Sequence, residues 1–130
     1  MHTRFMAAAM TVAAVVLTAP ANAVDNVRQC AGTAAQGVTP DMVIPACTAI
    51  IEEGMGGSVS LAGAYYNRGN AYYDKHDFPN AIADYDHAIK LKPNYPLALF
   101  NRGLAKKRSG DSVGGDADIA ASKAMKAQGD

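Results

Sequence analysis

A repeat of thirty-four residues constrains this chain more than any other feature. The segment Asn67–Gly69 recurs as Asn101–Gly103, and Asp84 recurs in step as Asp118. A period of this length is typical of a helix–turn–helix unit that stacks on copies of itself, because neither helix buries its apolar face alone. The period therefore predicts an all-α solenoid, and it points to a function in binding.

The first unit, residues 62–95, has the spacing of two amphipathic helices joined by a turn. Asp77 is expected to cap the second helix, with Pro79 in its first turn. Pro93 is expected to end that helix, since it cannot continue one. His76 stands where the second unit has a glycine, so we expect a left-handed backbone at this turn.

These residues resemble the tetratricopeptide repeat (TPR). That family reads aromatic-x-x-apolar-small-x-x-aromatic, then Ala-x-x-x-aromatic-x-x-Ala, then Pro. Seven of its eight positions are matched in the first unit, by Tyr65, Gly69, Tyr72, Ala81, Tyr85, Ala88 and Pro93. Arg68 is the exception, and its stem is expected to lie along the apolar face with its charged head in water.

The second unit, residues 96–130, is a degenerate TPR that is expected to close the solenoid. Lys106 replaces the second aromatic residue, and Ala127 stands where the first unit has a proline. Gly114 and Gly115 both fall inside the last helix, at a cost of about 1 kcal/mol each relative to Ala. The start of that helix is therefore expected to be frayed.

Residues 1–23 have the form of a secretory signal. A basic start precedes an apolar run from Phe5 to Ala19, and Ala21–Ala23 supplies a small-x-small cleavage pattern. The run is shorter than the roughly twenty residues of a permanent membrane helix. We expect cleavage after Ala23, no stable membrane insertion afterwards, and a periplasmic or secreted protein. An uncleaved anchor is the alternative.

Two cysteines, Cys30 and Cys47, lie in the segment 24–61. An oxidising compartment usually closes such a pair into a disulfide, whereas two free thiols would imply a reducing one. We expect this segment to form a helical leader ahead of the repeats, which gives about six helices in all. Small exported bacterial TPR proteins often carry a Cys-bearing leader, and this chain resembles them. Ser58 or Ser60 is expected to cap the next helix.

The TPR resemblance assigns the first helix of each unit to the inner, concave wall of the solenoid. The candidate partner-binding residues are Tyr66, Asn67, Asn70, Tyr73, Phe100, Asn101, Leu104, Lys107 and Arg108, with Gly63, Asp74 and Leu97 at the remaining wall positions. Asn offers a donor and an acceptor to a peptide backbone, aromatic rings offer apolar area, and basic residues suit a carboxylate. In the alternative interpretation, the asparagines bridge neighbouring helices instead of touching a ligand.

A carboxylate clamp of the kind found in chaperone-binding TPR proteins is only partly present. Asn70 and Asn101 have the spacing of its two asparagines, but Tyr66 stands where the clamp needs Lys. The remaining basic residues of such a clamp come from a third unit. A working clamp is therefore not expected.

No pattern of residues indicates an enzyme, a metal site or a cofactor. His76 and His87 do not stand beside a Ser or Cys nucleophile in a recognisable pattern, and His87 is expected on the surface. Without Arg4, which the signal carries, the net charge becomes about −1, which argues against nucleic acid as a main partner.

The sequence thus predicts a non-catalytic interaction module that binds a partner peptide or protein. The alternatives are a structural protein that self-associates through its apolar C-terminal helix and an accessory subunit of an envelope complex. An uncapped solenoid end favours stacking of copies.

Overall fold

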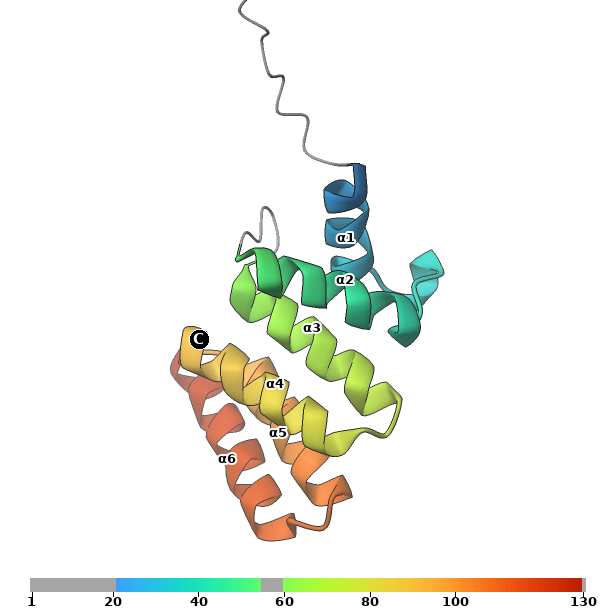
Figure 1. The fold of residues 1–130 in the computed structure, drawn as a ribbon. Coiled ribbons are helices and arrows are strands. Elements are labelled where there is room, and N and C mark those ends of the chain that lie inside the picture. Colours follow the sequence, from blue (N-terminus) through green and yellow to red (C-terminus); the bar gives the residue numbers. More distant parts are fainter. Residues whose placement is uncertain (1–20, 55–59, 130) are drawn as a thin grey trace, which may run out of the picture.

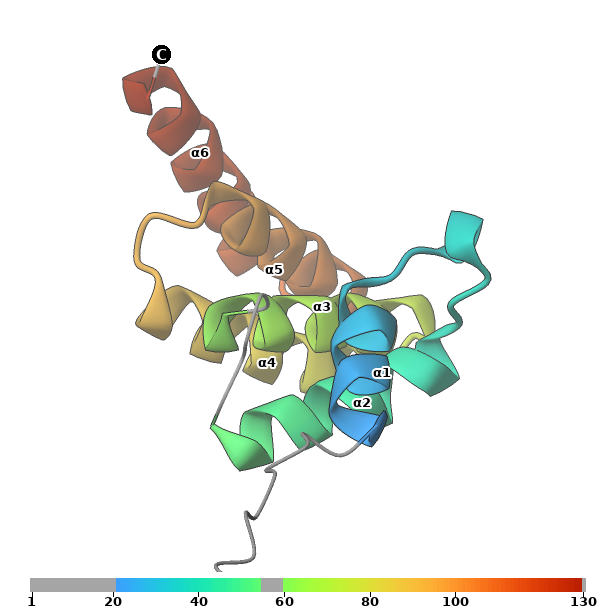
Figure 2. The same cartoon turned by 90° about the horizontal axis from the view of Figure 1, so that it is seen from above.

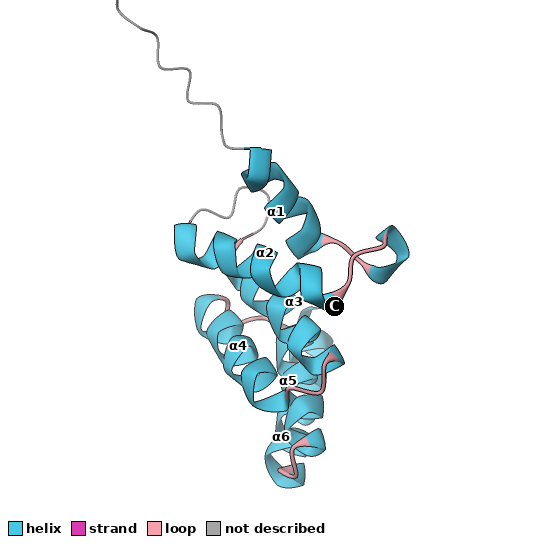
Figure 3. Ribbon diagram, turned by 45° about the vertical axis from the view of Figure 1, so that its right-hand side comes forward, coloured by secondary structure: helices cyan, strands magenta, loops and turns pink. Residues whose placement is uncertain are grey.

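The computed structural model describes residues 21–54 and 60–129, and within these ranges the chain forms helices and no strands (Figure 3). The helices are, in order, α1 (Ala21–Ala31), the short 3-10 helix η1 (Ala34–Gln36), α2 (Pro40–Glu53), α3 (Leu61–Asp74), α4 (Phe78–Leu91), α5 (Pro96–Arg108) and α6 (Ser112–Gly129). The predicted all-α fold with about six helices is confirmed.

Each α-helix packs against its neighbours along the chain, so the molecule is a stack of three helical pairs. The pairs are α1 with α2, α3 with α4, and α5 with α6, and the layers meet where α2 packs on α3 and α4 packs on α5 (Figure 1). This is the arrangement of a TPR-type solenoid. Most of the predicted signal lies outside the described residues, whereas Ala23 falls in the first turn of α1, so cleavage stays a prediction.

The turns within the repeats follow the local sequence closely. The Asp77 carboxylate accepts a hydrogen bond from the Asn80 N–H at 3.3 Å, and Pro79 lies in the first turn of α4. His76 has a φ of 60°, in the left-handed region that a glycine occupies in the second unit. Ser60 caps α3 through the Gly63 N–H, while Ser58 lies outside the described residues. The predicted turn geometry of the first unit is confirmed.

The glycines at the helix contacts set how closely paired helices approach. A Cβ on Gly69 would stand 2.8 Å from the Tyr85 ring, and one on Gly115 would stand 2.6 Å from the Gly103 carbonyl oxygen. The expected fraying at the start of α6 is wrong, because α6 is regular from Ser112. Close packing of the two helices through Gly103 and Gly115 offsets the low helix propensity of glycine.

The leader forms a helical pair that resembles the repeats in the length of its second helix and in the position of its central buried residue. Helices α2 and α4 both contain 14 residues, and Cys47 is the eighth residue of α2 as Tyr85 is of α4. Where the first repeat packs Tyr85 on Gly69, the leader joins Cys47 to Cys30 of α1 by the predicted disulfide. Both cysteines are buried. The covalent bond thus takes the place of an aromatic contact in the smallest layer.

Reduction of the disulfide is expected to destabilise the fold by about 3 kcal/mol, because a closed loop of this length restricts the unfolded chain. The Cys47→Ser variant is expected to lose a similar amount of stability. The measurement is urea unfolding of the exported protein with and without reductant, together with the intact mass. A mass that reduction leaves unchanged would contradict the bond, and Cys47→Ser in reductant is the control, since reductant then has nothing to cleave.

Candidate functional site

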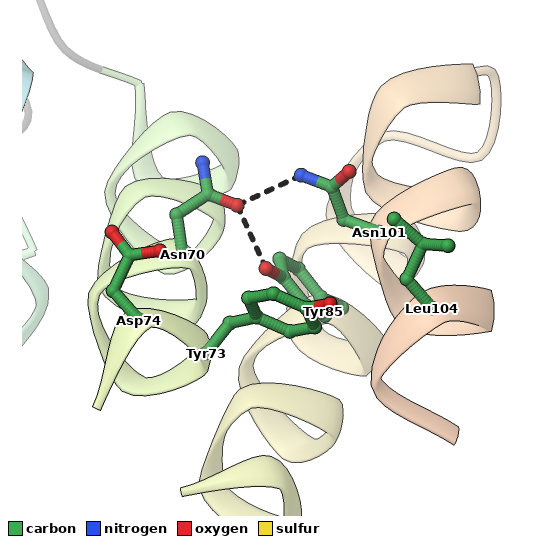
Figure 4. Close-up of a pocket in the computed structure, with 6 residues that line it drawn as sticks. All are labelled: Asn70, Tyr73, Asp74, Tyr85, Asn101 and Leu104. Atoms are coloured by element: carbon green, nitrogen blue, oxygen red, sulfur yellow. Dashed lines mark hydrogen bonds between the residues drawn. The ribbon is translucent and has the colours of Figure 1, made fainter. Parts of the chain in front are cut away.

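A polar network joins α3, α4 and α5 on one side of the molecule. The Asn70 Oδ1 atom accepts hydrogen bonds from the Tyr85 hydroxyl at 2.7 Å and from the Asn101 Nδ2 group at 2.9 Å (Figure 4). Asn101 Nδ2 also donates to the Tyr66 hydroxyl at 3.2 Å. Burial raises the pKa of Tyr85 above its ordinary value, so its hydroxyl remains a donor at neutral pH. The network holds the two asparagines side by side across the layer boundary.

Each asparagine of the network keeps one amide group unused. Within the described residues, Asn70 Nδ2 and Asn101 Oδ1 have no hydrogen-bond partner. Both amides are only half-buried. A peptide unit carries the complementary pair, a carbonyl oxygen and an N–H. The two amides can therefore hold a backbone segment without giving up the bonds that orient them.

The asparagine pair borders a hollow of about 290 Å³ between α3 and α5. Its lining residues are Asn70, Tyr73, Asp74, Tyr85, Asn101 and Leu104 (Figure 4). Tyr73 and Leu104 supply apolar surface, whereas the asparagines and Asp74 supply polar groups. The accessible lining is therefore more polar than apolar, with the apolar surface at two of its residues.

A second hollow, of about 180 Å³, lies between α3 and the leader. The leader contributes Cys30, Gly32, Thr33, Ala34, Val38, Pro40 and Val43, and α3 contributes Asn67, Asn70, Ala71 and Asp74. The second hollow shares Asn70 and Asp74 with the first, so the two adjoin along α3. The leader is not part of the predicted binding wall, because nothing in its local sequence pattern indicates that it folds back towards α3.

The structure brings together part of the predicted wall. Asn70, Tyr73, Asn101 and Leu104 line the first hollow, Tyr66 is bonded to Asn101, and Asn67 lines the second hollow. Phe100, Lys107 and Arg108 line neither hollow, and Lys107 instead forms an ion pair with Asp116 of α6. Tyr85, predicted only as a packing residue, reaches the site with its hydroxyl group.

The charged head of Arg68 does not lie in water, contrary to the expectation from the sequence. Its Nε and Nη2 atoms donate to the two oxygens of Asp84, each at 2.8 Å, and Nη1 donates to Thr48 of α2 at 2.9 Å. The Asp84 hydrogen bond, opposed by burial, raises the pKa of Arg68. The expectation was wrong because a carboxylate on the paired helix lies within reach of the guanidinium, and its two oxygens replace the water that the charged head would otherwise bind.

The second unit repeats this arrangement. Arg102 holds Asp118 through Nε at 2.7 Å and Nη2 at 2.8 Å, and reaches Asp86 of the preceding layer at 2.7 Å. Lys106 joins Asp118 at 2.9 Å. Burial opposes ionisation of Asp118, but the bonds from Arg102 and Lys106 outweigh it and lower the pKa of Asp118. The recurring Asn-Arg-Gly motif therefore has a structural part, the arginine, and a site part, the asparagine of the second copy.

A comparison of the sequence with protein families gives one match. The family model described as TPR repeat matches residues 69–110, which include the whole of α4 and α5. The match supports the TPR resemblance for the centre of the chain, and TPR repeats generally act as non-catalytic scaffolds for protein interactions. Comparisons with curated proteins and with solved structures found no match.

A metal site and a membrane-spanning helix are both absent from the residues that the structure describes. Among residues 21–54 and 60–129, no three His, Cys, Asp or Glu side chains come together in a way that would hold a metal ion. Nor does any helix of these ranges combine the length and the apolar character needed to cross a bilayer. His87 is exposed and stacks on Tyr65 at 4.8 Å between ring centroids.

Asp118→Asn is expected to lower the free energy of unfolding by about 3 kcal/mol at neutral pH, because Arg102 would then face an uncharged amide. The pKa of Asp118 is lowered by folding, so its contribution is present above the ordinary Asp pKa. It is lost as the pH falls through the folded-state pKa. The difference in free energy of unfolding between wild type and Asp118→Asn should therefore become smaller in acid. Urea unfolding at a series of pH values measures this difference.

The matched control for this experiment is Asp116→Asn. The Asp116 side chain is 66% exposed and pairs with Lys107 at the surface. Exposed ion pairs contribute at most about 1 kcal/mol. Equal losses of unfolding free energy from the two variants, or a difference between wild type and Asp118→Asn that stays constant with pH, would show that the Asp118 ion pair does not stabilise the contact between α5 and α6.

Proposed function

We propose that this protein is an exported interaction adaptor that binds an extended segment of a partner protein between α3 and α5. The observation that carries the proposal is the Asn70–Asn101 pair, with one free donor group and one free acceptor atom at the edge of the first hollow. The TPR match supports the general role, because repeats of this family mediate protein interactions.

Binding in this proposal involves no covalent chemistry. A peptide carbonyl accepts a hydrogen bond from Asn70 Nδ2, and a peptide N–H donates to Asn101 Oδ1. Side chains of the segment pack on Tyr73 and Leu104, which offer apolar area at little entropic cost. An accessory subunit of an envelope complex would use the same contacts, with another subunit as its partner.

The proposed compartment is the bacterial periplasm or the extracellular space. The signal-like residues 1–23 and the buried Cys30–Cys47 disulfide both support export. The peptide would then be a segment of an envelope or secreted protein.

Asn101→Ala is expected to weaken peptide binding by tenfold or more, because it removes the free acceptor atom and releases Asn70 from its bridge. The probe is a phage-displayed library of random peptides selected on the wild-type protein, followed by affinity measurements on synthetic copies of the selected peptides. Circular dichroism checks that the variant keeps its helical content.

The control variant is Asn94→Ala, since Asn94 is exposed in the α4–α5 connection and lines neither hollow beside α3. It should bind the selected peptides as wild type does. If the library yields no binder, or if Asn101→Ala binds every selected peptide unchanged, the groove is not the binding site.

Self-association through α6 is a second candidate function. Val113 is 84% exposed, and a mostly small, apolar surface continues along the helix at Ala117, Ala120, Ala121 and Ala124. If copies stack there, light scattering across a concentration series will show growth above the monomer mass, and Val113→Asp will abolish it. A constant monomer mass would eliminate this candidate and leave the groove as the functional surface.

A further inference from the structure

We infer that the groove continues across α3 onto the leader and selects an extended peptide that carries a Lys or Arg side chain, which Asp74 binds. This inference rests on the proposed function and adds the chemical class of the partner segment. It follows from how the two hollows adjoin and from the charges around them.

The two hollows form one path because they share lining residues. Asn70 and Asp74, one turn apart on α3, border both of them. In Figure 2, helix α5 and the loop that carries η1 both lie above α3, α5 towards the left and the loop towards the right. A chain that crosses α3 at the asparagine pair therefore reaches the apolar leader residues Val38 and Val43.

Among the residues that the structure describes, Asp74 is the only charged one that lines either hollow. Its neighbour Lys75 is already engaged in an ion pair with Asp41 of the leader. Within residues 21–54 and 60–129, Asp74 has no ion-pair partner at all. The groove thus presents one uncompensated negative charge at its midpoint.

A cationic side chain is the group that matches this charge. An ammonium or guanidinium group gains a charge-assisted hydrogen bond at Asp74, whereas a ligand carboxylate would be repelled. This site would therefore prefer a positively charged ligand group, whereas a carboxylate clamp binds a negatively charged one.

The spacing fixes roughly where the cation belongs in the peptide. Residues four apart on a helix, such as Asn70 and Asp74, have Cβ atoms about 6 Å apart. In an extended chain, side chains on the same face are about 7 Å apart, which corresponds to two residues. The basic residue is therefore expected within about two positions of the peptide unit that Asn70 holds, with an apolar residue beyond it against the leader.

The experiment compares peptide selections from the same random library on wild type, Asp74→Asn and the control Asp25→Asn. Asp25 is an exposed residue of α1 that lines neither hollow, so its variant has the same change in net charge. Wild type and Asp25→Asn should enrich Lys or Arg at one position, and Asp74→Asn should not. A peptide selected on wild type should bind Asp74→Asn about fivefold more weakly than it binds wild type. Raised salt should reduce that difference in affinity.

A paired substitution separates this contact from a general loss of binding. If the basic residue of the selected peptide is replaced by Gln, wild type and Asp74→Asn should bind the peptide equally. The Asp74 assignment would be overturned if Asn101-dependent peptides show no enrichment of Lys or Arg, or if they show the same enrichment when selected on Asp74→Asn. The proposed function would still stand in either case. A library without any Asn101-dependent binder would overturn both.

Discussion

A bidentate ion pair between an arginine and an aspartate is the interaction on which the layered structure depends. Arg68 holds Asp84 and Arg102 holds Asp118, and each arginine also reaches the helix before its own layer, at Thr48 and at Asp86. One side chain thus connects three helices at each layer boundary. Because the guanidinium is planar and its donors are fixed in direction, it sets the orientation of those helices as well as holding them together.

The groove is a consequence of that stacking. With the layers in register, α3 and α5 lie close enough for Asn101 Nδ2 to donate a hydrogen bond to Asn70 Oδ1 at 2.9 Å. The Tyr85 hydroxyl of α4 donates to the same Asn70 oxygen. The arginines satisfy the charges at the layer contacts, so the asparagines on the other side of the same helices remain available for a ligand. Stability and recognition therefore use different residues of the same two helices.

The leader contributes to both the core and the proposed site. Its disulfide closes a layer that has few large side chains, and Val43, Ala46 and Ile50 pack around the two cysteines. Cys30 also forms part of the lining of the second hollow. The covalent bond that completes the fold thus fixes one wall of the groove, and a loss of the bond would alter the surface that a partner meets.

The sequence by itself determined the helical repeat, its turns and the cysteine pair, because periodicity, capping and chain spacing act over a few residues. His76 and Asp77 are examples, since a left-handed turn and a helix cap are local. Only the tertiary structure decided the partners of Arg68, the bridge from Asn70 to Asn101, and the approach of the leader to α3. Those contacts depend on the crossing of helices and on side-chain directions across layers, and a periodic pattern specifies neither.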